Sequence, residues 1–335
     1  MKKQRGLALK LALVVVLCFS VLLTTGCGEE EKVMYQNPLT GVMSETQWPA
    51  RPLQVSIDNV GDAIPQSWLS KADLVYEFPV EGNQTRLQAI YYSEFPEEFG
   101  PIRSTRPYFV DLAREYKAVF LAHGWSPQAK SYLLSDVIPY INAMNSDCDF
   151  YRVEDKSSPH DSYIKWESVK AKIDEKGWWD EKQQIRPFAF YGEDETYTGN
   201  TVNEIEFDYM YSEFEFTYDA ETGQYKRTLD GVDAIDKETQ EVITADNVLV
   251  QYVKSSVIDA KGRLEIDMCA GGEAVLFTKG GIVKGIWTRE DLDSRTIFTD
   301  ADGNEFKFSV GNTWVEVVDQ NCDVEYDVIK AETAE

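Results

Sequence analysis

The sequence predicts an α/β (α+β) protein in two parts. Residues 51–195 are expected to form a layered mixed-sheet domain, and residues 196–322 a mostly antiparallel β domain. In the first part, apolar runs typical of strands alternate with segments of helical periodicity. In the second part, short apolar runs are separated by Asp and Gly clusters, as in consecutive hairpins. A chain of 335 residues is long enough for two domains with a core each.

The N-terminus predicts export. A basic start, MKKQRGLALK, precedes the apolar run from Leu11 to Leu23, and TTGCG follows directly. The run is shorter than the ~20 residues that a membrane span needs. We therefore expect residues 1–26 to be a lipoprotein signal peptide and Cys27 to carry the lipid. The mature chain would be extracytoplasmic, held by that lipid on the outer face of the cytoplasmic membrane. A signal peptide without lipidation and an uncleaved anchor are the alternatives.

Charge and composition exclude several classes of partner. The formal net charge is −25, so the chain lacks the basic face that a nucleic-acid phosphate backbone requires. Beyond Cys27, the cysteines of the mature chain are Cys148, Cys269 and Cys322, and they lack the spacing of a zinc site. With two histidines in the chain, we expect no metal centre. The spacing does not say whether any cysteine pair forms a disulfide, and no cofactor is indicated.

The expected elements follow in chain order. Residues 27–50 are polar, aperiodic and contain two prolines, so they predict a tether that lifts the folded part off the membrane. In the first domain we expect strands at 52–58, 73–80, 86–93 and 118–124, and helices at 107–116 and 160–177. Hairpins are expected at 216–229, 232–243, 257–266 and 298–308. Residues 323–335 are expected to be a tail, and the β-rich domain suits contacts with a protein partner.

The octapeptide GPIRSTRP, residues 100–107, is the strongest candidate for a binding site. Pro107 suits the first turn of a helix, while Ser104 and Thr105 are residue types that cap one. Arg103 and Arg106 lie beside that helix N-terminus, where the dipole favours anions and arginine's fork matches carboxylate or phosphate oxygens. The alternative is that these arginines form ion pairs within the protein, for which Glu77 and Glu81 are the candidate acids.

Other polar residues are expected at the same strand ends. Arg86 follows a Gly-Asn turn and begins a strand that leads towards GPIRSTRP. Asp58 and Asn59 end the first strand, and Asp73 begins the second. In open α/β sheets ligands bind at strand ends where the strand order reverses, so these residues could face one cleft with the arginines.

Both histidines are candidates as well. His123 ends an apolar strand, and Ser126 follows in the same loop, although HGWS is not the nucleophile elbow of a serine hydrolase. His160 is expected at a helix start, where the dipole would favour neutral imidazole that could act as a base. A histidine hydrogen-bonded into a loop is the alternative for each.

Several long motifs resemble one family. NPLTG (37–41), PQSWLSKADLVYEFPVEGNQTR (65–86), GPIRSTRPYFVDLA (100–113), AHGWSPQA (122–129), SPHD (158–161) and GNTWVEVV (311–318) resemble the YerB-like family of bacterial lipoproteins. The resemblance covers nearly the whole mature chain and implies an envelope lipoprotein, but the family has no known activity. Asp161 and Trp125 depart from the family pattern, where asparagine and glycine are expected.

A fainter similarity is to the LytR-CpsA-Psr phosphotransferases, which hold a polyprenyl pyrophosphate with arginines and aspartates. The similarity rests on the order of SID, KAD, a strand and an arginine-bearing loop. At the level of single residues it implies a role only for Asp73 and the arginines. Two functions therefore remain open. One is a binding or scaffold lipoprotein whose arginine cleft recognises an anionic envelope component. The other is an envelope-assembly enzyme that transfers or hydrolyses a phosphate-linked glycan.

Overall fold

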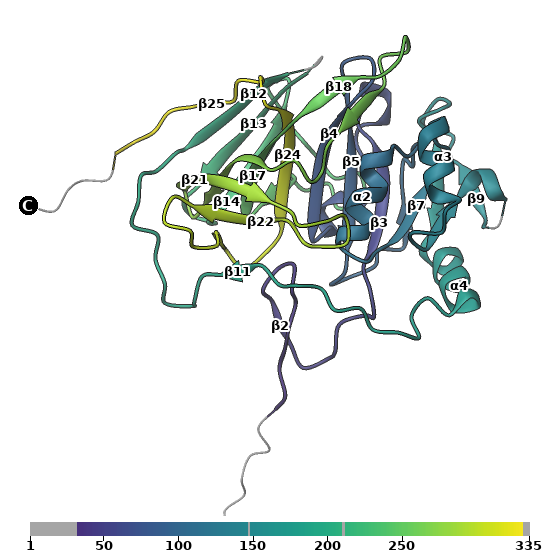
Figure 1. Ribbon diagram of the computed structural model, residues 1–335, viewed down its shortest axis with the longest axis horizontal. Coiled ribbons are helices and arrows are strands. Elements are labelled where there is room, and N and C mark those ends of the chain that lie inside the picture. The colour runs from purple at the N-terminus through teal and green to yellow at the C-terminus, as the bar shows by residue number, and fades with distance from the viewer. Residues whose placement is uncertain (1–31, 147, 210–211, 331–335) are drawn as a thin grey trace, which may run out of the picture.

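The computed structural model describes residues 32–146, 148–209 and 212–330 (Figure 1). The expected signal peptide and Cys27 lie outside these residues. Among the helices of the described ranges, none has the length and apolar character that crossing a bilayer requires.

One ten-stranded sheet runs through both halves of the chain. Its strands lie in the order β22-β21-β20-β17-β24-β4-β5-β3-β7-β8. The first half supplies β3 (Leu53–Asp58), β4 (Leu74–Val80), β5 (Gln84–Tyr91), β7 (Val119–Ala122) and β8 (Tyr140–Asn142). The second half supplies β17 (Asn247–Val253), β20 (Gly272–Thr278), β21 (Gly281–Thr288), β22 (Ile297–Asp300) and β24 (Thr313–Asp319). Because β24 pairs in parallel with both β4 and β17, this strand joins the halves.

The two faces of this sheet are covered differently. One face packs against a second, antiparallel sheet and α4 (Trp166–Lys176). The second sheet contains β12 (Glu204–Tyr209), β13 (Ser212–Asp219), β14 (Gln224–Leu229), β15 (Val232–Asp233), β16 (Thr244–Ala245) and β25 (Glu325–Tyr326). The other face packs against α2 (Pro107–Glu115) and α3 (Pro127–Leu133), and α2 crosses in front of β3 and β5 in Figure 1. Both hydrophobic clusters include residues from both halves, so the halves do not have the separate cores that we expected.

The alternation within β3 shows how the sheet positions polar groups. Leu53, Val55 and Ile57 belong to the cluster on one face. The intervening residues Gln54 and Ser56 point to the other face and are fully buried. Gln54 Nε2 donates to the Phe109 carbonyl of α2 at 3.0 Å. A polar row therefore leads beneath α2 towards the end of β3.

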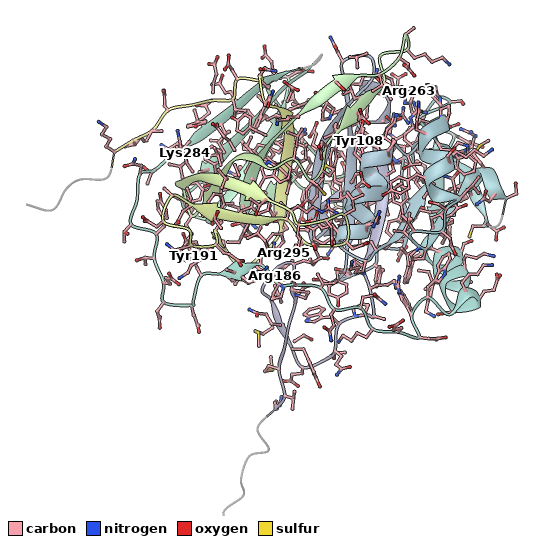
Figure 2. All side chains as sticks on the ribbon, in the orientation of Figure 1. Tyr108, Arg186, Tyr191, Arg263, Lys284 and Arg295 are labelled. Atoms are coloured by element: carbon pink, nitrogen blue, oxygen red, sulfur yellow. The ribbon has the colours of Figure 1, made fainter. Side chains whose placement is uncertain are left out.

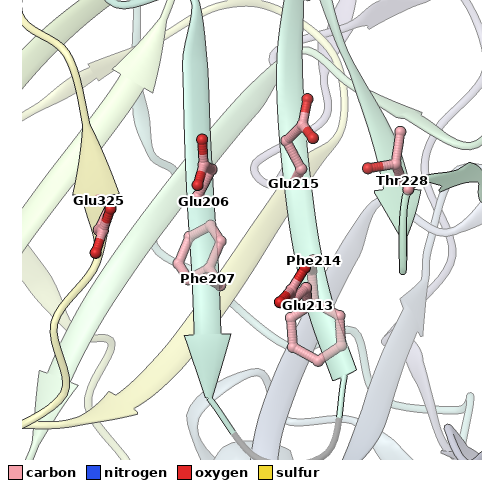
Figure 3. A pocket seen from close by; sticks show the side chains of 8 residues that line it. Glu206, Phe207, Glu213, Phe214, Glu215, Thr228 and Glu325 are labelled. Atoms are coloured by element: carbon pink, nitrogen blue, oxygen red, sulfur yellow. The ribbon is translucent and has the colours of Figure 1, made fainter.

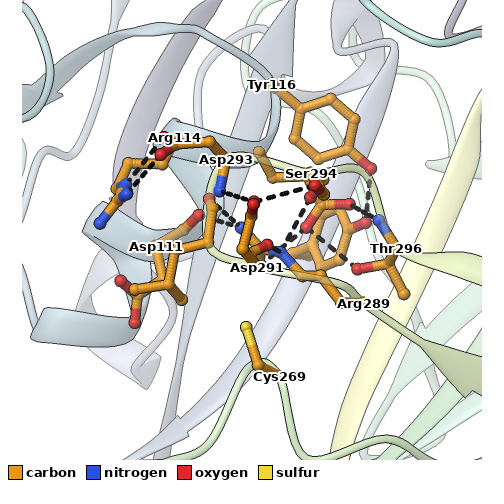
Figure 4. Close-up of polar contacts among 12 residues, drawn as sticks. Asp111, Arg114, Tyr116, Cys269, Arg289, Asp291, Asp293, Ser294 and Thr296 are labelled. Carbon is orange, nitrogen blue, oxygen red and sulfur yellow. Dashed lines mark hydrogen bonds and ion pairs between the residues drawn. The ribbon is translucent and has the colours of Figure 1, made fainter.

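A buried ion pair fastens α2 to the second half of the chain (Figure 4). Arg289 Nη1 lies 3.1 Å from Glu115 Oε2, and both side chains are fully shielded from solvent. Arg289 Nη2 also donates to the Asp111 carbonyl at 2.8 Å, and Glu115 accepts from the Thr296 N–H at 2.8 Å. These contacts hold the loop between β21 and β22 against the C-terminal end of α2.

Shorter elements complete the described residues. The strands are β1 (Tyr35–Gln36), β2 (Met43–Ser44), β6 (Glu98–Phe99), β9 (Phe150–Arg152), β10 (Ser162–Lys165), β11 (Ala189–Phe190), β18 (Ser255–Val257), β19 (Leu264–Ile266) and β23 (Lys307–Phe308). The 3₁₀ turns are Gly61–Ala63, Leu69–Lys71 and Ala143–Asn145.

Most expected elements are confirmed, including the fold class of a layered mixed sheet followed by antiparallel β-structure. The helix expected over 160–177 begins too early. Residues Ser162–Lys165 form β10 between β6 and β9, and the helix starts at Trp166. Tyr163 and Ile164 are fully buried in that small sheet, and this packing outweighs the helical spacing of the segment.

Residues 27–50 do not form a simple tether where they are described. Strands β1 and β2 pair as a hairpin, and its connecting loop is anchored to the body. Asn37 is fully buried, and its Nδ2 donates to Ser93 Oγ at 2.7 Å and to Asp73 Oδ1 at 3.3 Å. At the other terminus, β25 pairs with β12, so the expected tail begins as part of the second sheet.

Candidate functional site

The ends of β3 and β5 bring the central residues of the site together. Asp58, the last residue of β3, lies directly opposite Arg86 of β5 in the antiparallel register. The GPIRSTRP loop runs along the same end, because the Arg103 N–H donates to the Ser56 carbonyl at 2.8 Å and the Asp58 N–H to the Pro101 carbonyl at 2.9 Å. These backbone hydrogen bonds therefore fix the position of Arg103 beside the end of β3.

The carboxylate of Asp58 is the centre of the site. It is 1% exposed, and its Oδ2 lies 2.9 Å from Arg103 Nε and 2.7 Å from His160 Nδ1. The Arg103 and His160 side chains are 23% and 16% exposed, so the pair they form with Asp58 borders solvent. We expected His160 at a helix start from the sequence. The structure contradicts this, because β10 lies between His160 and α4.

Arg86 lies beneath this surface. It is 4% exposed, and its Nη1 donates to the Ser104 carbonyl at 2.7 Å, whereas its buried Nε has no hydrogen-bond partner among the described residues. Burial lowers the pKa of Arg86 to about 10, and the positive charge of Arg106 acts in the same direction. Asp58 opposes these effects, and Arg103 adds a further lowering. Arg86 is therefore close enough to Arg103 and Arg106 to be repelled by both.

Arg106 pairs within the protein, as the alternative interpretation predicted. Its Nε donates to Glu81 Oε2 at 2.9 Å, and Nη2 contacts the second oxygen of the same carboxylate. Burial works to raise the pKa of Glu81, but the hydrogen bonds and charge of Arg106 lower it on balance. Arg106 is also the N-cap residue of α2, without a side-chain cap. Ser104 and Thr105 consequently do not cap this helix, although Pro107 occupies its first turn as predicted.

The loop after β7 supports GPIRSTRP. The Thr105 N–H donates to the Gly124 carbonyl at 3.1 Å, and the Ser126 N–H donates to the Thr105 carbonyl at 3.2 Å. Gly124 has a φ of +93°, and a Cβ there would lie 2.8 Å from Ser104 Oγ, so the close approach requires glycine. Ser126 Oγ accepts from the Ala129 N–H at 3.2 Å and caps α3. Thr105 and Ser126 thus have structural roles here.

His123 lies next to the site, but its imidazole contacts Ser162 and not Asp58. Its Nδ1 is 2.5 Å from Ser162 Oγ, and its ring meets Phe150 edge-on with 5.8 Å between centroids. Burial lowers the pKa of His123, and the charges of Arg152 and Arg103 lower it further. The imidazole is therefore held neutral near cations.

Three of the predicted site residues, Asp73, Glu77 and Asn59, have other partners than Arg103. Asp73 accepts from the Tyr92 and Ser93 N–H groups at 2.6 and 2.8 Å, and burial raises its pKa. It stands five residues from Phe78, the partner of Arg86 on β4, which is ~17 Å along a strand at ~3.3 Å per residue. The set shared with the phosphotransferases is therefore not assembled at one centre.

Glu77 and Asn59 face the other side of the sheet. Glu77 is fully buried and pairs with Arg227 of β14 at 2.9 Å. Asn59 Nδ2 donates to Glu77 Oε1 at 2.8 Å. Glu77, a candidate partner for the arginines of GPIRSTRP, thus links the two halves of the chain and pairs with Arg227 instead.

Three further polar residues of this region were not predicted from the sequence. Gln66 Nε2 donates to the Asp58 carbonyl at 3.1 Å and to Asn59 Oδ1 at 2.8 Å. Lys156, whose Nζ donates to the Ala63 carbonyl at 2.8 Å, lies near enough to Asp58 for its pKa to respond to that charge. Arg152 pairs with Asp161 and lies near His123. No motif around these residues in the sequence indicates these contacts.

A separate acidic hollow of about 260 Å³ lies on the second sheet (Figure 3). Glu206 of β12 stands directly opposite Glu215 of β13 on one side and Glu325 of β25 on the other. Within the ranges that the structure describes, no group of three or more His, Cys, Asp or Glu side chains is arranged to hold a metal ion. The hollow is therefore a row of like charges across three strands.

Comparison with known proteins identifies the family. Residues 39–179 match the family described as "Protein of unknown function (DUF3048) N-terminal domain", and residues 204–315 match its C-terminal domain. The "Putative lipoprotein YerB" of Bacillus subtilis is 34% identical over 91% of this chain and 94% of its own length. The crystal structure of the YerB protein from Bacillus subtilis matches with a TM-score of 0.78 and 32% identity, and the match covers 88% of this chain and 99% of that one. The chain belongs to the DUF3048 family of YerB-like proteins, whose function is unknown.

Proposed function

We propose that this protein is a lipid-anchored envelope protein that binds an anionic, phosphate- or carboxylate-bearing envelope component through Arg103 and its neighbours. The lipoprotein name of the YerB relative supports the anchored location.

The observation that carries the proposal is the state of the Arg103 guanidinium. Its Nε lies 2.9 Å from Asp58 Oδ2 but outside hydrogen-bond geometry, and among the described residues none forms a hydrogen bond with its two Nη atoms. These donors form one edge of a planar fork that matches two oxygens of a carboxylate or phosphate. With its side chain 23% exposed, Arg103 can meet a ligand without opening the fold.

The local charge balance favours the same chemistry. Three guanidinium groups, those of Arg86, Arg103 and Arg106, face the carboxylates of Asp58 and Glu81. The pKa of Arg86 is lowered first by its burial and then by the positive charges of Arg106 and Arg103. A bound anion would offset the repulsion between Arg86 and the other two arginines. Such a cluster of positive charge stands out in a chain with a formal charge of −25.

The enzyme alternative has less support. It required Asp73 beside the arginines, but Asp73 lies at the opposite end of β4 and β5. Without Asp73, the site has the Arg103 guanidinium as an anion-binding group. Its carboxylate, Asp58, is already paired with Arg103 and His160. We therefore propose binding and no reaction.

Calorimetric titration with inorganic pyrophosphate tests the proposal. The chain from residue 28 onwards, which contains every described residue, is expected to bind it. Arg103→Ala should weaken binding about tenfold or more, because a charge-assisted bond contributes ~1.5–3 kcal/mol and 1.4 kcal/mol is tenfold. Arg103→Lys keeps the charge but loses the planar fork, so its affinity for pyrophosphate should lie between those of the wild type and Arg103→Ala.

Arg186→Ala is the matched control. Like Arg103, Arg186 pairs with one carboxylate, that of Glu305, and in Figure 2 it lies well away from Tyr108, which is near Arg106. Its removal should leave pyrophosphate affinity unchanged. Equal affinity in wild type and Arg103→Ala, or binding by neither, would contradict the proposed site and leave the ion pairs as purely structural.

A further inference from the structure

The β1–β2 hairpin carries a concentrated set of exposed apolar side chains. Val33, Met34, Val42 and Met43 are 65%, 44%, 39% and 51% exposed. They lie together because Gln36 pairs with Met43 and Tyr35 with Ser44 across the hairpin. Figure 1 shows this hairpin projecting from the body of the molecule. Soluble surfaces rarely gather apolar side chains at a projecting end without a partner.

We propose that this hairpin seats in the interface of the lipid bilayer to which Cys27 is anchored. The proposal rests on lipidation of Cys27, which is part of the proposed function. Met34 follows Cys27 by seven residues, which span at most ~25 Å when fully extended. A chain anchored at Cys27 therefore cannot carry the hairpin far from the bilayer surface.

An aromatic hollow beside the hairpin has the composition of a membrane interface. It measures about 690 Å³, and its lining includes Tyr35, Trp48, Tyr92 and Lys182. Trp48 Nε1 donates to the Tyr35 carbonyl at 3.0 Å, and Tyr92 Oη donates to the Pro49 carbonyl at 3.0 Å. Tyrosine and tryptophan concentrate where an apolar medium meets water, since each has an apolar body and a polar tip.

Charge indicates which force would hold the hairpin. The chain is strongly acidic, and Lys32 at the open end of the hairpin is paired with Glu45 at 2.5 Å. Lys182 in the hollow is a single cation, so attraction to anionic headgroups is small and apolar burial is the main contribution. We expect seating in neutral phosphatidylcholine vesicles and no weakening by salt.

The seated hairpin would orient the arginines away from the bilayer. Asn37 ties the hairpin to Asp73, at the end of β4 that lies ~17 Å from the level of Arg86. At the arginine end, Gly262 of the β18–β19 hairpin approaches the Glu81 side chain, and Figure 1 places β18 at the opposite edge of the molecule from β2. The anion bound by Arg103 would then be carried by a component that extends from the membrane, and not by a headgroup of the same bilayer.

Quenching of Trp48 fluorescence tests the seating directly. The lipoprotein is purified from membranes and reconstituted in phosphatidylcholine vesicles with brominated acyl chains. Bromine quenches indoles at the interface, and the Trp48→Phe variant isolates the contribution of this residue from the other tryptophans. We expect quenching that disappears in Trp48→Phe and persists in 1 M salt.

Two double variants complete the test. Met34→Glu/Met43→Glu should reduce the Trp48 quenching at least threefold. Val257→Glu/Ile258→Glu replaces side chains of similar exposure, 66% and 41%, at the other end of the molecule and should leave it unchanged. Absence of Trp48 quenching in the lipidated wild type, or equal quenching in both variants, would overturn the proposal. Self-association in solution that depends on Met34 and Met43 would instead assign the hairpin to a second copy.

The mass of the N-terminal peptide reports lipidation independently. A chain without lipid on Cys27 would refute the anchor itself, whereas a lipidated chain without quenching would refute only the seating. Neither result depends on pyrophosphate binding, so failure of the anion site remains distinguishable.

Discussion

Asp58 and Arg103 form an ion pair of 2.9 Å at the end of β3, and the same carboxylate oxygen contacts His160. Asp58 therefore serves two partners from two loops that are more than fifty residues apart in the sequence. It holds Arg103 in place and also competes with any anion for that guanidinium. This double role makes Asp58 a sharper probe of the site than the arginine alone.

Replacing Asp58 separates these two roles. Asp58→Asn removes one negative charge beside Arg103, so affinity for pyrophosphate should rise several-fold. Stability should fall by ~1–3 kcal/mol, because Arg103 and His160 lose a charged partner within a buried site. Titration calorimetry and urea unfolding measure the two effects. Weaker anion binding in a variant that remains folded would show that the carboxylate does not compete.

The buried pair of Glu77 and Arg227 should dominate the coupling of the two halves. Its atoms lie 2.9 Å apart, and the side chains are 0% and 4% exposed. Arg227→Ala leaves Glu77 without its charged partner and should destabilise the protein by ~3–5 kcal/mol. The shift of the urea midpoint measures this loss. Lys170→Ala, which breaks the exposed helical pair with Asp174, should cost under ~0.5 kcal/mol, and similar losses in both variants would be inconsistent with the prediction.

His123 should make stability depend on pH. Burial and the nearby arginines lower its pKa in the folded state below the ordinary value of 6.5. The unfolded chain therefore binds more protons in this range, and the contribution of His123 to stability is lost as the pH falls below about 6.5. NMR titration should place one of the two imidazoles of the chain below its ordinary pKa. Unfolding between pH 5 and 7 should show a smaller slope in His123→Gln, and an unchanged slope would refute the assignment.

The acidic row on the second sheet should be a source of strain. Like charges directly opposite across strands are destabilising, and Glu206 has a glutamate on each side. Glu206→Gln should therefore raise stability by ~0.5 kcal/mol at low salt. The gain should shrink in 1 M salt, where the screening length is ~3 Å. A variant that is less stable than wild type at both salt concentrations would indicate that Glu206 has a favourable partner.

Local patterns in the sequence predicted much of the first half. The apolar runs became β3, β4, β5 and β7, and Pro107 began α2 as expected. The joining of the halves was not predictable in the same way. Strand β24 is inserted between β17 and β4, and a register between segments so distant in sequence depends on which apolar faces pack together.

The candidate site was predictable in part. The arginines of GPIRSTRP and Arg86 do converge, because Asp58 and Arg86 are cross-strand neighbours at adjacent strand ends. Asp73 was assigned to the wrong end, since antiparallel β4 and β5 place the start of one strand at the end of the other. His160 was expected at a helix start because Ile164 was grouped with Val169 and Ile173 on one helical face, whereas Ile164 belongs to the short buried strand β10.

The position of a bound anion decides whether Arg103 is a binding group. Crystals of the chain from residue 28 onwards, grown with pyrophosphate, would be examined for density at the end of β3. We expect an anion within hydrogen-bond distance of the Arg103 Nη atoms, on the side of Asp58 that faces Arg86 and His160. Density for pyrophosphate elsewhere, with Arg103 bonded only to Asp58, would contradict it.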